Sequence, residues 1–516
     1  MDNGTTSVRR RQLARHTVWN LIGLCAPMLI ALVAIPLLIR GLGNERFGLL
    51  SLIWMVVGYF SIFDLGLGRA LTRTVAEKLE HAPAEVPAAF WTAMMMMLGL
   101  GAAAGALVYA ASPWLVEDVL TIDPPLQPES LRSFRSVALA LPLLVTVTGL
   151  IGALEACRKF PLINLIRMPM GAYTFAGPLL VLPFRQDLLA VVWVLLAGRI
   201  VEWLLYFAAC LRYVPGVRSA WAFDRQGAPR LLSFGGWMTV SNIVQPLMVH
   251  IDRFLIGAIR AVSDVAFYAT SAEIVVKLLI FPRAWVSVLF PAFAAEYRSD
   301  PAGTGGLMAQ SVRLLLALMF PATLILVAFA PEGLALWLGP EYGLRSAPVM
   351  RWLAAGILLH SLAFVPASFL QGIGRPDLTA KLHAVELPIY LALAGLLIHG
   401  FGIEGAAATW LLRAAAEFGA TAWLAGARAR GCGREFCRIG AAAALCLAAL
   451  ALVTVPDSLW MKLAVVFLLL LGFSACFWFL VFTESDRRVI QKRLPFRPGP
   501  KPDRPEAGPA DRSLLK

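Results

Sequence analysis

Long apolar segments recur along almost the whole chain, and this pattern constrains the fold more than any motif does. A helix needs about 20 apolar residues to cross the hydrocarbon layer of a membrane. Segments of this kind lie at residues 17–39, 47–68, 88–112, 133–154, 162–184, 188–211, 231–258, 266–291, 311–330, 347–370, 379–400, 404–427, 437–455 and 459–482. Hydrophobic residues make up 59% of the chain and charged residues only 15%, unlike a soluble domain. We therefore predict an all-α polytopic membrane protein with about fourteen transmembrane helices.

Basic residues alternate between the connections, and this alternation predicts the orientation. Cytoplasmic loops retain Lys and Arg. Basic residues precede the first predicted span and follow the second, fourth, sixth, tenth and twelfth: Arg9, Arg10, Arg11, Arg15, Arg69, Arg73, Lys78, Arg158, Lys159, Arg212, Arg218, Arg225, Arg230, Arg375, Lys381, Arg428, Arg430, Arg434 and Arg438. The intervening connections are short or acidic, as between Glu117 and Glu129. Both termini are therefore predicted to be cytoplasmic.

The charge and the connections also exclude several classes of function. The net charge of +13 is explained by the basic loops and a basic tail, so we expect no nucleic-acid partner. The connections are too short to hold a nucleotide-binding or glycosyltransferase domain. The sequence contains neither a Walker motif nor a metal-ligand helix, and its six His residues are scattered. We expect no catalytic residue, no metal and no cofactor.

An internal repeat is visible when the chain is shifted by 218 residues, which places Trp19 on Trp237, Leu37 on Leu255 and Phe63 on Phe281. Both copies begin on the same side of the membrane, so they are parallel repeats, with binding sites expected between them near mid-membrane. The predicted organisation is a cytoplasmic segment (1–16), an N-lobe of six helices (17–212), a linker (213–230), a C-lobe of six helices (231–430), two further helices (431–484) and a disordered basic tail (485–516).

Several stretches, in this order, resemble the landmarks of one family: Trp19-Asn20, Pro36 to Gly48, Gly58-Tyr59-Phe60, Phe63 to Leu71, Asp252 to Gly257, Leu336 to Tyr342 and Gln371 to Asp377. The family is that of the bacterial polysaccharide and O-antigen flippases, within the multidrug/oligosaccharidyl-lipid/polysaccharide exporter superfamily. The resemblance covers most of the chain up to about residue 430. It implies two six-helix bundles that face each other across a central cavity and work by alternating access.

The resemblance also implies a substrate, a location and partners. The substrate would be an oligosaccharide attached through diphosphate to a polyprenol, moved across the bacterial inner membrane. Membrane lipids and other polysaccharide assembly proteins would be the further partners, and coupling to an H⁺ or Na⁺ gradient stays open. The alternative is a cation-coupled multidrug antiporter of the same superfamily. Such antiporters usually place a buried carboxylate in the first helix, and residues 17–39 contain none.

A lipid diphosphate needs cations facing a wet cavity, and its sugar needs amides and aromatic faces. The first candidates are Arg69 and Arg73, one helical turn apart just after the second span, with Asp64 inside it. One interpretation is a basic ledge that receives the diphosphate at the cytoplasmic mouth. The other is ordinary topological anchoring, with Asp64 capping or pairing locally.

The seventh span supplies a second group of candidates. Asn242, Gln245 and Asp252 return to roughly one face of a helix, beside Arg253. This face would either line the cavity and contact sugar hydroxyls or diphosphate, or bond neighbouring helices to one another.

Charged pairs inside spans form the third group. Glu273 and Lys277 in the eighth span have i, i+4 spacing, and so do Arg413 and Glu417 in the twelfth. Arg199 and Glu202 in the sixth span have i, i+3 spacing. Opposite charges at these spacings neutralise one another. Lys277 is predicted to lie near the membrane centre, where release from Glu273 would free a cation for substrate.

Overall fold

The computed structural model describes residues 3–58, 64, 66–218, 220–224, 229, 248, 250–297, 300–429 and 433–481, and for residues 3–28 it describes the backbone alone. These residues form α-helices with a few short 3-10 and π segments, and no strand is found among them. The helices are α1 (Asn3–Gly58), α2 (Leu67–His81), α3 (Val86–Trp114), α4 (Gln127–Ala156), α5 (Phe160–Val181), α6 (Leu188–Tyr213), α8 (Val262–Lys277), α9 (Ile280–Glu296), α10 (Pro301–Ala328), α11 (Ala330–Leu338), α12 (Pro340–Gly372), α13 (Pro376–Gly426), α14 (Gly433–Leu452) and α15 (Leu459–Cys476).

Eight helices within the described ranges are long and apolar enough to cross a membrane. Two of the helices run through a kink and so join two predicted spans each. Helix α1 bends at Gly43 (φ 80°, ψ 166°), and α13 bends at Gly402 (φ 62°, ψ −139°). Both backbone conformations favour glycine because they place a Cβ in steric conflict. Most of the predicted seventh span lies outside the described residues.

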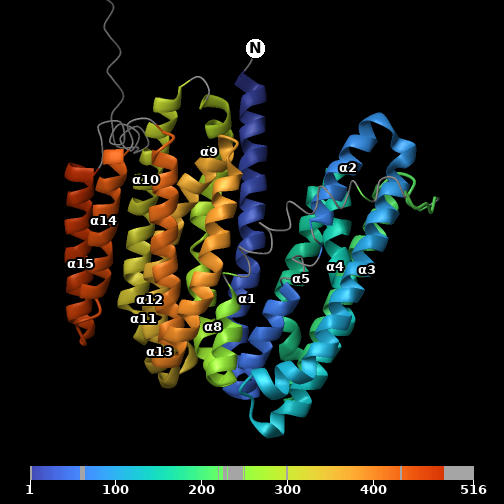
Figure 1. Ribbon diagram of the computed structural model, residues 1–516, viewed down its shortest axis with the longest axis horizontal. Coiled ribbons are helices and arrows are strands. Elements are labelled where there is room, and N and C mark those ends of the chain that lie inside the picture. The colour runs from blue at the N-terminus through green and yellow to red at the C-terminus, as the bar shows by residue number, and fades with distance from the viewer. Residues whose placement is uncertain are drawn as a thin grey trace, which may run out of the picture.

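The helices form two bundles, as predicted (Figure 1). Helices α2 to α6 make up one bundle, and α8 to α13 make up the other. Helix α1 lies between them and packs on both α5 and α8. Helices α14 and α15 stand at the outer edge of the second bundle, which agrees with the prediction of two additional C-terminal helices.

In the N-lobe, the described part of α1 ends at Gly58 and α2 begins at Leu67; between them the structure describes only Asp64 and Gly66. In the C-lobe, α8 ends at Lys277 and α9 begins at Ile280. The parallel repeat stays a prediction.

The lobes are joined at the end of the molecule opposite the N-terminus, while the bundles diverge toward the N-terminal end (Figure 1). The Thr121 amide donates a hydrogen bond to the Gly257 carbonyl (2.8 Å), and the Val262 amide donates to the Thr121 carbonyl (3.2 Å). Gly48 packs so tightly here that a Cβ on it would lie 2.0 Å from the Val262 carbonyl oxygen. This junction closes one end of the space between the lobes.

Candidate functional site

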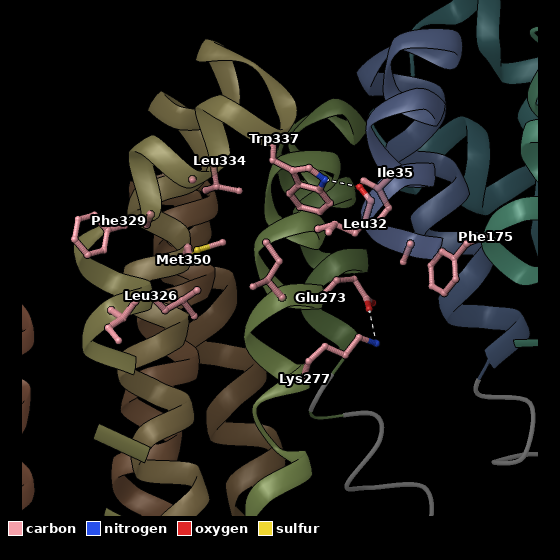
Figure 2. Close-up of a pocket in the computed structure, with 15 residues that line it drawn as sticks. Leu32, Ile35, Phe175, Glu273, Lys277, Leu326, Phe329, Leu334, Trp337 and Met350 are labelled. Atoms are coloured by element: carbon pink, nitrogen blue, oxygen red, sulfur yellow. Dashed lines mark hydrogen bonds and ion pairs between the residues drawn. The ribbon is translucent and has the colours of Figure 1, made fainter. Parts of the chain in front are cut away.

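A cavity of about 370 Å³ lies between α1, α5, α8, α10, α11 and α12 (Figure 2). Its wall is almost entirely apolar, with Leu32, Ile35, Phe175, Leu326, Trp337 and Met350 among the lining residues. The indole nitrogen of Trp337 donates a hydrogen bond to the Leu32 carbonyl (2.6 Å), which ties α11 to α1. Glu273 and Lys277 are the charged members of the lining. Figure 2 shows both pointing from α8 toward α1 and α5.

Two cations share the carboxylate of Glu273. The Arg253 guanidinium donates to Oε1 at 3.0 Å, and the Lys277 ammonium lies 3.4 Å from Oε2. The Arg253 side chain is only 7% exposed, whereas that of Lys277 is 44% exposed. The cluster therefore presents its more accessible cation to the cavity. Glu273 therefore shares its one negative charge between two cations, Arg253 and Lys277.

Asp252 is fully buried and points away from this cluster. Tyr268 on α8 donates a hydrogen bond to one carboxylate oxygen (2.6 Å), and Tyr390 on α13 donates to the other. Adjacent helical residues point about 100° apart, so Asp252 and Arg253 serve different neighbours. The carboxylate of Asp252 therefore joins helices within the C-lobe, and it is not among the residues that line the cavity.

The polar interior of the C-lobe continues to α12 and the second half of α13. Arg413 donates to Glu417 at 3.0 Å, the i, i+4 pairing that the sequence predicts. His360 on α12 lies 2.8 Å from the same carboxylate oxygen. All three side chains are buried, so this network holds the C-lobe together internally.

Asp64 lies between Gly58, the last described residue of α1, and Leu67, the first residue of α2, and it is buried. Its carboxylate accepts hydrogen bonds from the backbone amides of Gly66 (2.8 Å) and Gly68 (3.3 Å). It thereby supports the left-handed turn at Gly66 (φ 74°) from which α2 starts. Arg69 and Arg73 are both exposed, on the first two turns of that helix. The structure does not bring them to the cavity lining.

Asn242 and Gln245 lie outside the described residues. Of the predicted candidates, the structure brings together Arg253, Glu273 and Lys277, and it places Asp64, Arg69 and Arg73 near the start of α2.

Two sets of polar residues escaped the prediction. Tyr268 and Tyr390 bond to Asp252, but a single tyrosine in an apolar span carries no distinctive pattern. Arg167 is exposed on α5 and is the only charged residue of that helix. The sequence alone could have indicated Arg167, because a charge inside a membrane span is energetically costly and is therefore often functional.

Comparison with known proteins decides the family. The family described as polysaccharide biosynthesis protein matches residues 13–295. The chain is also 30% identical over 421 residues to a protein of Shigella flexneri described as a putative O-antigen transporter. That alignment covers 80% of this chain and 97% of the relative. The chain belongs to the polysaccharide biosynthesis protein family. It is therefore a transporter and not an enzyme.

Solved structures show the same fold. The lipid II flippase MurJ in an inward closed conformation superposes with a TM-score of 0.73 and 11% identity, covering 92% of this chain and all of that one. A multidrug resistance transporter of the MOP superfamily in an inward-facing conformation gives a TM-score of 0.66 at 14% identity, covering 82% of this chain and 98% of that one. The polysaccharide biosynthesis family member described here thus has the architecture of the superfamily that the sequence motifs resemble.

Proposed function

We propose that this protein moves a polyprenyl-diphosphate-linked oligosaccharide from the cytoplasmic to the external leaflet of the bacterial inner membrane. Transport would proceed by alternating access between the two lobes and would serve the synthesis of a surface polysaccharide. Membership in a polysaccharide biosynthesis family and relatedness to a putative O-antigen transporter support this substrate class.

The observation that carries the proposal is the composition of the cavity wall. A polyprenol chain requires apolar surroundings, whereas the diphosphate requires cations that are not fully neutralised. Leu32, Phe175 and Trp337 provide apolar surroundings in the cavity. Lys277, which is half-exposed and shares Glu273 with Arg253, provides a cation. Apolar wall and cationic edge thus meet in one space.

The conformation suits a protein awaiting substrate from the cytoplasm. Both termini are cytoplasmic in our proposal, because the basic connections lie on that side. The junction around Thr121 and Val262 then closes the external end, while the bundles diverge toward the cytoplasm (Figure 1). A lipid-linked glycan assembled in the cytoplasmic leaflet would enter from the diverging end.

Reconstitution tests this function. Purified protein in liposomes should move a labelled polyprenyl-diphosphate oligosaccharide between leaflets without changing its mass. Liposomes without protein, and liposomes holding the Lys277→Gln variant, serve as controls. Transport of cationic drugs against an ion gradient, with no movement of the lipid, would overturn the proposal in favour of a multidrug antiporter.

A further inference from the structure

The carbonyl of Leu32 on α1 has no donor at the usual place in its own helix. In an α-helix, each carbonyl accepts a hydrogen bond from the amide four residues later. Four residues after Leu32 stands Pro36, and a proline has no N–H to donate. A backbone group without a partner is costly in an apolar environment. In membrane helices, a carbonyl freed by a proline is therefore bonded by a neighbouring helix, a side chain or water.

Trp337 of the C-lobe supplies the donor for this carbonyl. Its indole nitrogen donates to the Leu32 carbonyl oxygen at 2.6 Å. Figure 2 shows Trp337 reaching from α11 to the backbone of α1, well away from Glu273 and Lys277. An indole N–H can only donate, and apart from Glu273 and Lys277 the described cavity lining is apolar. The two groups, which come from different lobes, therefore satisfy each other.

A second contact lies on the other side of a short segment of α1. Residues 37–42 lie between the proline and the kink at Gly43. Trp337 bonds to α1 before this segment, and Tyr342 bonds to Asn44 after it. Trp337 and Tyr342 stand on either side of the turn between α11 and α12. One corner of the C-lobe thus holds α1 on both sides of this segment, at the end where the lobes are joined.

We propose that Trp337 is a positioning residue for transport, and that its hydrogen bond to the Leu32 carbonyl holds the lobes together at the external end. This inference deepens the proposed function, because it rests on alternating access between the lobes. When the external end opens, the two lobes separate, so the indole and the carbonyl lose their partners together. No amide within α1 replaces the indole, because Pro36 occupies the donor position. The bond therefore favours the conformation that is open to the cytoplasm.

Two substitutions act on this bond from opposite sides. Trp337→Phe removes the indole N–H and keeps an aromatic ring. Pro36→Ala restores an amide N–H inside α1, so the Leu32 carbonyl stays bonded after the lobes separate. Each substitution alone should favour external opening. Because both act on the same carbonyl, their effects should not add, and this coupling separates a bond to Leu32 from a merely structural role of the Trp337 ring.

Distances between spin labels on the purified full-length protein test the inference. Asp118 and Leu344 are exposed, one on each lobe near the junction, and carry the labels. Trp337→Phe should raise the ratio of externally open to closed protein about two- to tenfold, the usual effect of losing one hydrogen bond. In the Pro36→Ala background, the same substitution should change the ratio less than about twofold. Trp203→Phe is the matched control, because it removes an indole hydrogen bond of 2.8 Å that joins α6 to α4 within the N-lobe, and it should leave the distances unchanged.

The outcomes separate this inference from the proposed function. Wild-type distances in Trp337→Phe would overturn the inference. A full effect of Trp337→Phe in the Pro36→Ala background would also overturn it, because the indole would then act independently of the Leu32 carbonyl. The distances are measured without substrate, so either result leaves the proposed function standing. If the predicted coupling is present but the protein moves no lipid-linked oligosaccharide in liposomes, the proposed function alone fails.

Discussion

Tyr342, at the start of α12, donates a hydrogen bond to the side chain of Asn44, with 2.9 Å between the Tyr342 hydroxyl and Asn44 Oδ1. Asn44 follows the kink at Gly43, and its side-chain amide nitrogen lies 3.4 Å from a carboxylate oxygen of Glu341. The two residues are 298 positions apart and belong to different lobes. This contact therefore reports directly on whether the lobes are joined at their closed end.

Replacing Tyr342 with Phe removes the hydroxyl and should weaken that closure by about 0.5–1.5 kcal/mol, the usual net contribution of one hydrogen bond. The expected result is a larger population open at the Asn44 end, measured as the distance between spin labels on the two lobes. Tyr297→Phe is the control, because Tyr297 bonds to Arg428 within the C-lobe. Identical distance distributions for Tyr342→Phe and wild type would contradict this role.

We expect the Gly48→Ala variant to have a stronger effect at the same junction. A Cβ at Gly48 would lie 2.0 Å from the Val262 carbonyl oxygen, so Gly48→Ala should force the helices apart. Gly99 is the matched control, since it is also helical and a Cβ added there would meet no other group within 4 Å. Gly48→Ala should make a cysteine at Thr121 more reactive to an impermeant reagent, whereas Gly99→Ala should leave it unchanged. Equal reactivity in both variants would show that the packing relaxes freely.

Local spacing was enough to predict part of the site. The i, i+4 pairs Glu273–Lys277 and Arg413–Glu417 follow from helix geometry alone, and both are present. Partners distant in sequence were not predictable in this way. Tyr390 is 138 residues from Asp252, and Arg253 bonds to Glu273 only because two helices pack side by side. Tertiary packing determines such contacts, and it leaves no periodic signal in the chain.

The fold was more accessible to prediction than the site, for a physical reason. Apolar length and basic connections specify where helices cross a membrane and how they are oriented. The kinks at Gly43 and Gly402 were not predicted, although each joins two predicted spans into one helix. A single glycine in a connection is common, and its backbone angles become known only from the structure.

Tyr390 should matter for stability rather than for substrate contact. Its hydroxyl bonds to the fully buried carboxylate of Asp252, so Tyr390→Phe should lower the free energy of unfolding by about 1–3 kcal/mol, the cost of leaving a buried group without its partner. Thermal unfolding of the purified protein measures this effect. Tyr213→Phe, at a partly exposed position, is the control. If Tyr390→Phe unfolds at the same temperature as the wild type but no longer transports, the Asp252 network would instead lie in the transport path.

Arg69 and Arg73 provide a test of the ledge interpretation. Both are exposed on α2, and neither lines the cavity. If they receive the diphosphate, Arg69→Gln and Arg73→Gln should reduce transport several-fold, with normal amounts of folded protein in the membrane. Arg428→Gln is the control, because Arg428 bonds locally to the Leu424 carbonyl. If both variants transport normally but show altered topology in reporter fusions, the role of Arg69 and Arg73 is topological anchoring.

The most direct test of whether Lys277 at the cavity edge provides a cation for the diphosphate is transport by liposomes that contain the Glu273→Gln, Lys277→Met double variant. This variant removes both members of the pair at the cavity edge, so it leaves no unpaired Glu273 charge to complicate the comparison. Arg253 would remain buried, without the carboxylate that it shares with Lys277. We predict that folded double-variant protein fails to move the labelled polyprenyl-diphosphate oligosaccharide. Transport at the wild-type rate would contradict it, because the substrate would then find its cations elsewhere.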